Sequence, residues 1–247
     1  MALEVRLRQD TPIQLDATLA CAADEMLALV GPSGSGKSTI LSLCLRLHDP
    51  EAGRVLIDGH DIREFTVASL RSQISVSLQD PVLFAMTVRE NIGLGGQNVT
   101  QAAIEAAAEL ANADSVVRAL PEGYETIVGE RGVSLSRGQR QRIALARCAV
   151  RQAPIVLLDE PFTGLDEESR RAVSLGFERL AQGRTTLLVT HELADAVSCD
   201  LILFLERGRI VERGTHGELM RHSGRYASMF RAQQTGTTGQ GPQRATA

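Results

Sequence analysis

The chain has 247 residues and a hydrophobic content of 43%, which is enough for one large domain with a substantial core. Its net charge of -4 and its aromatic content of 3%, with no Trp, argue against a protein that binds nucleic acid over its main surface. The four cysteines are widely spaced without a CxxC pair, so neither a disulfide framework nor a zinc site is expected, and a reducing cytosol is the natural compartment. The apolar runs are far shorter than the roughly 20 residues that span a bilayer.

The N-terminal segment 1–10 mixes charged residues with single apolar ones, so we expect an edge strand there rather than a secretory signal. Further along the chain, short β-rich runs alternate with helical segments, and this alternation is typical of a parallel sheet. These runs are residues 26–30, 74–78, 155–158 and 186–190. The predicted fold class is therefore α/β.

One long segment interrupts this alternation. Residues 99–120 are rich in Ala, Glu and Leu, which predicts helix, and Ser136 is a suitable cap for a second helix over 136–150. We predict a helical subdomain at about 80–150, inserted into a folded domain that covers residues 1–231. The final stretch, 232–247, has no apolar periodicity, so we predict a disordered tail.

A glycine-rich loop carries the first chemical motif. Residues 31–38 satisfy GxxxxGK[ST] and lie between the apolar run 26–30 and the helical run 39–47. Such a loop points backbone N–H groups and a helix N-terminus at one phosphate, while a lysine adds a point charge. The predicted nucleotide-binding residues are Gly31, Ser33, Gly34, Ser35, Gly36, Lys37, Ser38 and Thr39.

Two carboxylates follow the buried run 155–158. Asp159 is placed to hold magnesium together with Ser38, and Glu160 is placed to face an attacking water. With the phosphate loop, this pair predicts a P-loop NTPase. A P-loop kinase or GTPase would satisfy the same two tests, so the class of NTPase depends on further motifs.

The segment 135–147 closely resembles the signature sequence of ATP-binding-cassette (ABC) proteins. In that resemblance, Ser136, Gly138 and Gln139 belong to a helix N-terminus that presents donors to the γ-phosphate of a nucleotide bound by the opposite subunit. Arg137 stands where the family usually has glycine, which adds a positive charge close to that phosphate.

The resemblance implies roles for three more residues. Gln79 matches the Q-loop glutamine, which senses magnesium and communicates with a transmembrane partner; Asp166 matches the D-loop aspartate; and His191 matches the switch histidine, which helps Glu160 hold the water. The implied architecture is a RecA-like core with an antiparallel β portion and the inserted helical subdomain. Two such units are expected to sandwich two molecules of ATP with Mg²⁺, as a homodimer or a heterodimer.

Several segments resemble the exporter branch of the family, namely 57–62, 79–84, 128–132 and 208–216. We therefore expect the chain to power export, bound to transmembrane domains at the cytoplasmic face of a membrane, either as a separate subunit or as a domain of a longer protein. Residues 160–166 and 190–192 look closer to importer ATPases, so the sequence is also compatible with an importer subunit. It is compatible, too, with a soluble ABC protein acting on nucleic acid or ribosomes, or with a non-hydrolysing regulatory subunit.

The adenine site departs from the exporter pattern. Exporters usually carry an aromatic residue that stacks on adenine, yet no Phe, Tyr or Trp precedes Phe65. Arg6 or Arg8 could stack on the base through its guanidinium plane. We hypothesise weak discrimination between ATP and GTP.

Overall fold

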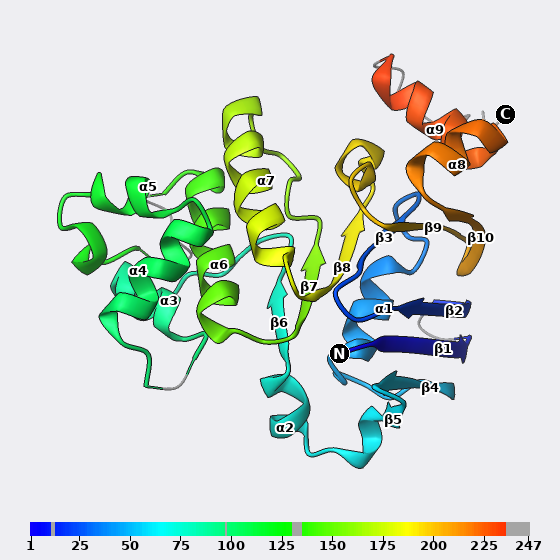
Figure 1. Cartoon of the computed structure of the whole chain (residues 1–247), viewed down its shortest axis with the longest axis horizontal. Coiled ribbons are helices and arrows are strands. Elements are labelled where there is room, and N and C mark those ends of the chain that lie inside the picture. Colours follow the sequence, from blue (N-terminus) through cyan, green and yellow to red (C-terminus); the bar gives the residue numbers. More distant parts are fainter. Residues whose placement is uncertain (11–12, 97, 130–134, 236–247) are drawn as a thin grey trace, which may run out of the picture.

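The computed structural model describes residues 1–10, 13–96, 98–129 and 135–235. Ten strands form one sheet, and helices cover both of its faces (Figure 1). The strands are β1 (Leu3–Gln9), β2 (Leu15–Cys21), β3 (Met26–Val30), β4 (Ala52–Ile57), β5 (His60–Asp61), β6 (Ile74–Ser77), β7 (Ile155–Asp159), β8 (Thr185–Thr190), β9 (Leu201–Glu206) and β10 (Arg209–Gly214). The helices are α1 (Lys37–Cys44), α2 (Val67–Ser72), α3 (Val88–Gly93), α4 (Gln101–Leu110), α5 (Asp114–Arg118), α6 (Arg137–Arg151), α7 (Glu167–Ala181), α8 (His216–His222) and α9 (Arg225–Gln234), with 3-10 turns η1 (Ile62–Glu64), η2 (Gly123–Glu125) and η4 (Leu193–Ala196).

The sheet has a parallel half and a largely antiparallel half. Its strand order is β5-β4-β1-β2-β10-β9-β3-β8-β7-β6. Strands β9, β3, β8, β7 and β6 run parallel, whereas β4, β1 and β2 pair antiparallel. The four β-rich runs predicted from the sequence are β3, β6, β7 and β8, so the predicted α/β class with an antiparallel portion is confirmed.

Two hydrophobic cores lie on opposite faces of the sheet. One packs α1, through Ile40 and Leu43, between the antiparallel strands and the parallel half. The other covers the opposite face with α6, α7 and the C-terminal helices. Because β7 and β8 are sandwiched between these cores, their side chains are buried on both faces, which explains why both strands read as continuous apolar runs.

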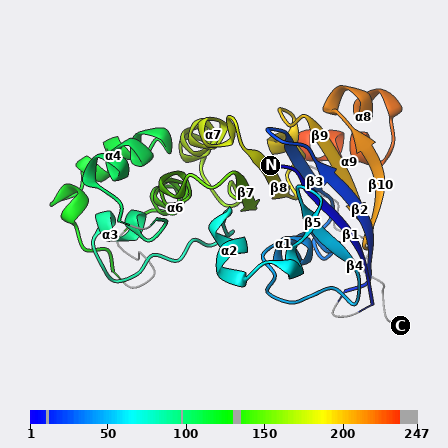
Figure 2. The same ribbon diagram turned by 60° about the horizontal axis from the view of Figure 1, so that its bottom comes forward.

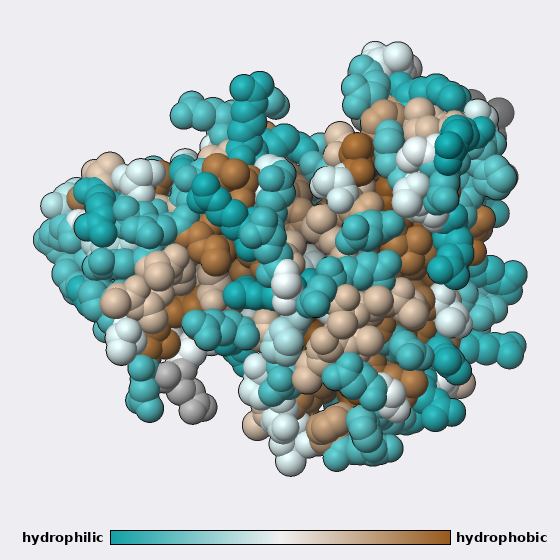
Figure 3. All heavy atoms as spheres, viewed as in Figure 1, coloured by the Kyte–Doolittle hydropathy of each residue, from teal (hydrophilic) through white to brown (hydrophobic). Residues whose placement is uncertain are grey.

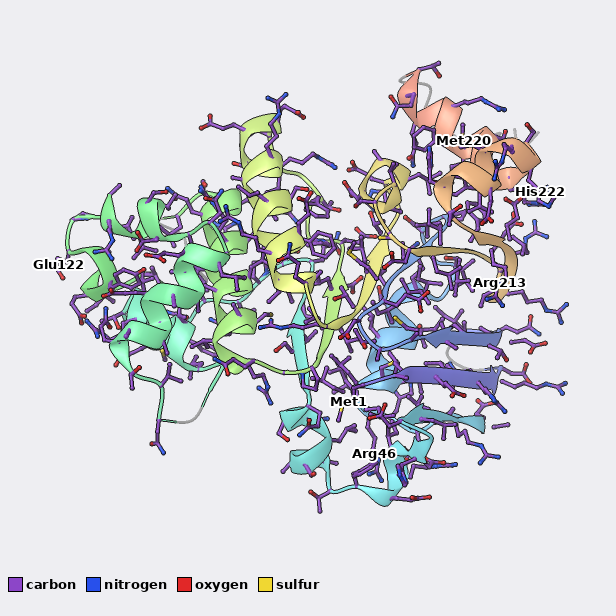
Figure 4. All side chains as sticks on the ribbon, viewed as in Figure 1. Met1, Arg46, Glu122, Arg213, Met220 and His222 are labelled. Atoms are coloured by element: carbon purple, nitrogen blue, oxygen red, sulfur yellow. The ribbon has the colours of Figure 1, made fainter. Side chains whose placement is uncertain are left out.

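A group of helices projects from one end of the molecule, and α8 and α9 lie at the other (Figures 1 and 2). Helices α3 to α6 make up this group, and α6 packs against α3, α4, α7 and β6. Glu122, at the tip of the helical group, and His222, near the C-terminal end, lie at opposite sides of the side-chain view (Figure 4). The helices predicted at 99–120 and 136–150 correspond to α4, α5 and α6, within the segment predicted as the inserted subdomain.

Two predictions at the ends of the chain were wrong. Strand β1 is not an edge strand, because it is bonded to β2 on one side and β4 on the other. Helix α9 continues to Gln234, three residues into the predicted tail, because Gln233 makes hydrogen bonds to a loop that is remote in sequence. Residues 236–247 of the predicted tail lie outside the described residues, as do residues 130–132 of the exporter-like segment 128–132.

Hydrophilic side chains cover most of the face drawn in Figure 3. Among the described residues, no helix combines the length and apolar character that a membrane span requires. All four cysteines are free and buried, and burial raises the pKa of each thiol to about 12.

Candidate nucleotide-binding site

The glycine-rich loop joins β3 to α1 and lines a pocket of about 240 Å³. Residues from the loop and from the start of α1 form most of its wall, together with Ile13 and Glu160. Gly31 begins the loop with φ 145°, and a Cβ there would lie 2.0 Å from the backbone oxygen of Leu205. The loop thus passes too close to β9 for any residue but glycine.

Lys37 is held inside this loop. Its side chain is 5% exposed, and its ammonium group donates to the carbonyl oxygens of Gly31 at 2.7 Å and Pro32 at 2.9 Å. Burial lowers the pKa of Lys37, while the nearby Glu160 and Asp159 act in the opposite direction. A buried cation at the mouth of a loop of backbone donors is suited to bind an anion. The Ser35 hydroxyl, also buried, has no hydrogen-bond partner among the described residues.

Ser38 and Asp159 form the candidate magnesium site. The Ser38 hydroxyl donates to Asp159 Oδ1 at 3.2 Å, at the end of β7. Burial raises the pKa of Asp159, and the hydrogen bond from Ser38 opposes that shift. One hydroxyl and one carboxylate are hard oxygen donors, and Mg²⁺ is commonly held by one or two such side chains plus phosphate oxygens. The residues present therefore fit Mg²⁺.

Glu160 lies at the centre of a cluster of polar groups. Its carboxylate accepts a hydrogen bond from Gln79 Nε2 at 2.9 Å and another from the Thr163 hydroxyl at 3.2 Å. His191 Nδ1 lies 2.9 Å from Glu160 Oε1, although these two atoms are not aligned for a hydrogen bond. Glu160 itself has φ 46°, a strained conformation that costs about 1 kcal/mol or more and is found disproportionately at functional sites.

The turn after His191 is tied to α7 by charge. The Arg170 guanidinium pairs with the carboxylates of both Glu192 and Asp195. The side chain of Asp195 is 8% exposed, and the Thr190 hydroxyl donates to it at 3.1 Å. Burial raises the pKa of Asp195 to about 6, with Arg170 acting in the opposite direction.

This raised pKa predicts a pH dependence of stability. Since the folded state binds the Asp195 proton more tightly than the unfolded chain, the contribution is fully present below about pH 4 and is lost as the pH rises through about 6. The free energy of unfolding of the wild type, relative to Asp195→Asn, should fall by about 2 to 3 kcal/mol over that range. Urea unfolding of both proteins between pH 4 and pH 7.5 measures it. A difference that stays constant or grows with pH would contradict the assignment.

The signature residues begin α6. Ser136 is the N-cap: its hydroxyl accepts from the Gln139 N–H at 3.2 Å, and Gln139 Oε1 accepts from the Ser136 N–H at 2.8 Å. Ser136 is exposed, and its hydroxyl donates no hydrogen bond to another residue in the described part of the chain. Gly138 is buried against Ser169 of α7. None of these three residues lines the pocket at the glycine-rich loop of the same chain.

Arg137 is held by contacts within its own chain. Its guanidinium pairs with Asp80 at 2.9 Å and donates to the carbonyl of Gln79 at 3.4 Å. A Cβ on Gly164, which has φ 69°, would lie 2.8 Å from Arg137 Nη1. The arginine therefore links the start of α6 to the segment after β6 and to the turn before α7, within one chain.

Asp166 and Arg6 both lie outside the pocket at the glycine-rich loop. Asp166 caps α7, accepting from Ser169 N at 2.8 Å, and this hydrogen bond lowers its pKa. Arg6 is an exposed residue of β1 paired with Glu4. Ile13, rather than Arg6 or Arg8, lines the pocket at the glycine-rich loop. It could not be predicted from the sequence, because an isolated isoleucine in a loop carries no motif.

The structure thus brings together the residues of the phosphate loop, Ser38 with Asp159, and Glu160 with Gln79 and His191. A phosphate loop between a parallel strand and a helix, with an acid pair at the end of a neighbouring strand, defines the P-loop NTPase class. Ser136, Gly138 and Gln139 do not line the pocket of their own chain.

Comparison with known proteins gives the family. A profile of the ABC transporter family matches residues 15–163. ABC transporter B family member 3 of Dictyostelium discoideum is 47% identical over 92% of this chain, and an ATP-dependent lipid A-core flippase of Alkalilimnicola ehrlichii is 46% identical over 90%. These matches cover 16% and 38% of the two relatives, so the chain spans well under half of their length.

A solved structure of a bacterial Atm1-family ABC exporter with ATP bound matches with a TM-score of 0.87 and 39% identity. That match covers 94% of this chain and 42% of the exporter chain. The chain belongs to the ABC transporter family.

Proposed function

We propose that the chain binds and hydrolyses Mg-ATP as the motor domain of an ABC exporter, and that it works as a dimer with a second ABC domain. The observation that carries the proposal is the placement of Glu160 beside the phosphate loop, where Gln79, Thr163 and His191 surround its carboxylate. A carboxylate held in this way can orient and polarise the water that attacks the γ-phosphate.

The other residues of the site bind and position the nucleotide. Lys37 and the amides of residues 34–39 hold the phosphates, and Ser38, Gln79 and Asp159 would hold Mg²⁺, which neutralises charge on the phosphate oxygens when bound. His191 assists Glu160 in holding the water. In this scheme Gln79 contacts both the metal site and the general base, so it senses whether nucleotide is present.

The position of the signature residues supports dimerisation. Because Ser136, Gly138 and Gln139 do not line the pocket of their own chain, we infer that they complete the site of the partner. Asp166 lies at the exposed start of α7, where it can approach the same interface. ATP would then stabilise the closed dimer, and hydrolysis would reopen it.

An apolar groove supports the proposal of a transmembrane partner. Leu78, Pro81, Val82, Phe84 and Leu94 line a groove of about 260 Å³, and four of these side chains are about half exposed. Arg147 supports its wall, donating to the carbonyls of Val82 and Asn91 and lying over the ring of Phe84. Leu78 and Pro81 of this groove lie on either side of Gln79 in the sequence, so a helix of a transmembrane domain seated there would contact the segment that carries the metal-sensing glutamine.

Variants of the groove test this docking. Val82→Asp should abolish stimulation of ATP hydrolysis by the transmembrane domains while the basal rate of the isolated chain stays within about twofold, because a buried unpaired charge opposes docking. Val211→Asp, an equally apolar and exposed position on β10, is the matched control. Normal stimulation of Val82→Asp in reconstituted membranes would place the partner elsewhere.

Export is favoured over import by the identities of the relatives, which include a lipid A-core flippase and an Atm1-family exporter. A cytoplasmic position at the membrane follows from that proposal. The importer-like sequence of residues 160–166 and 190–192 does not change the chemistry of the site, because it retains both Glu160 and His191. The presence of Glu160 and His191 also argues against a non-hydrolysing subunit.

We infer that Ile13, which lines the pocket at the phosphate loop, lies where the base of the nucleotide binds, and that nucleotide selectivity is therefore weak. Ile13 offers contact area without a π face, so ATP and GTP should bind with dissociation constants within about threefold of each other. Ile13→Tyr should tighten ATP binding about fivefold to tenfold by stacking, whereas Ile13→Leu should leave it unchanged. Fluorescence titration with both nucleotides measures this, and a wild-type preference for ATP above tenfold would refute it.

A further inference from the structure

The loop that carries His191 is held by a residue of the C-terminal helix. Gln233 on α9 donates from Nε2 to the carbonyl oxygen of His191 at 2.7 Å, and its Oε1 accepts from the N–H of Leu193 at 2.9 Å. The two bonds use opposite ends of one side-chain amide. A flipped amide would therefore place its oxygen against the carbonyl oxygen of His191 and its NH₂ group against the N–H of Leu193. The loop therefore fixes the orientation of Gln233, and Gln233 fixes two peptide groups of the loop.

The surroundings leave the backbone of His191 little freedom. Leu193 is fully buried, and Arg170 holds the side chains of Glu192 and Asp195 from the α7 side. The His191 ring itself is one-third exposed, with Glu160 at 2.9 Å. The same ring borders a cavity of about 530 Å³ that is also lined by the glycine-rich loop and by Gln233. Helix α9 is thus part of the wall next to the site.

We propose that Gln233 is a positioning residue: by holding the peptide of His191, it keeps the imidazole beside Glu160 in the geometry that hydrolysis requires. This inference rests on the role proposed for His191. Loss of the amide frees the carbonyl of His191 and the N–H of Leu193 together, so the loop can rotate and carry the ring away from the water. Misplacement of a catalytic group by about 1 Å can slow a reaction by as much as about 100-fold.

Steady-state ATP hydrolysis by the full chain gives the first test. Gln233→Met keeps the length of the side chain but neither hydrogen bond, and we expect kcat to fall about tenfold while KM for ATP stays within about twofold. Gln234→Met, the neighbouring exposed glutamine on the same helix, is the matched control and should behave as wild type. Activity of Gln233→Met within twofold of wild type overturns the proposal.

A double-mutant cycle separates positioning from support of the fold. If Gln233 acts through His191, Gln233→Met should cause no further loss in single-turnover hydrolysis when it is added to His191→Ala. An equal loss in both backgrounds means that α9 supports the fold only, and the proposal fails. Full activity of His191→Ala alone would instead refute the role of His191 in the proposed function, whatever Gln233→Met does.

A second variant covers the case in which Gln233→Met does not fold. Gln233→Glu still accepts from Leu193 N–H but places a carboxylate against the carbonyl of His191, so we expect the same loss of kcat in a folded protein. Near wild-type activity of Gln233→Glu would also overturn the proposal.

Discussion

Glu160→Gln should retain ATP binding and lose most turnover, by about 100-fold to 1,000-fold. The amide can still accept the hydrogen bond from Gln79, so the cluster is preserved, but it cannot polarise water as a carboxylate does. Removal of the negative charge also lessens repulsion of the nucleotide phosphates, so binding should be unchanged or tighter. ATP should therefore hold the variant as a closed dimer, detectable by light scattering coupled to size-exclusion chromatography.

The control is Glu178→Gln, which makes the same chemical change at an exposed position of α7. It should hydrolyse ATP as the wild type does. Full turnover of Glu160→Gln would remove Glu160 as the base. A variant that neither hydrolyses ATP nor dimerises with it would mean that the change damaged the site itself.

Lys37→Met should weaken ATP binding about 100-fold, because a charged donor to the phosphates is worth about 2 to 3 kcal/mol. Its effect on stability should be small, within about 1 kcal/mol. Methionine loses two hydrogen bonds to the loop, at Gly31 and Pro32, but it also removes the cost of burying an ammonium group. Isothermal titration and urea unfolding measure the two effects separately. Arg221→Met, which removes an exposed cation from α8, should change neither.

Lys37 also offers a direct observation of the site, because it is the only lysine in the sequence. Labelling with ¹⁵N-lysine therefore gives a single side-chain resonance. Its pH titration should show a pKa below the usual 10.5, caused by burial, and ATP should raise that pKa by placing anionic oxygens nearby. A normal pKa, or one that ATP leaves unchanged, would contradict the proposed contact between Lys37 and phosphate.

The parts of the fold that the sequence predicted are those fixed by local pattern. Strands β3, β7 and β8 are continuous apolar runs because both faces of the sheet are covered, and α6 has a serine cap at its first turn. The partners of β1 could not be predicted in this way, since β1 pairs with β4 across about 50 residues and the charged residues on its exposed face resemble those of an edge strand.

In the candidate site, too, the residues identified from local sequence differ from those that depend on distant parts of the chain. Local motifs predicted Lys37, Asp159 and Glu160, because their chemistry requires a fixed spacing from a strand end, and the family resemblance added His191. The residues that support them come from distant segments and carry no motif, notably Gln233 on α9 and Arg170 on α7. The sequence flagged Arg137 only as a departure from the family pattern, and its partner Asp80 became clear from the packing of α6.

The most direct test of the transport claim starts from the tagged gene product that carries this chain, extracted with detergent from its native membranes. The transmembrane segments that this product contains and the proteins that stay bound to it are then identified. We expect a multi-spanning transmembrane domain in stoichiometric amount, either fused or bound, that stimulates ATP hydrolysis. Recovery outside the membrane fraction, with ribosomes, DNA-repair proteins or no partner, would contradict it and favour a soluble ABC ATPase.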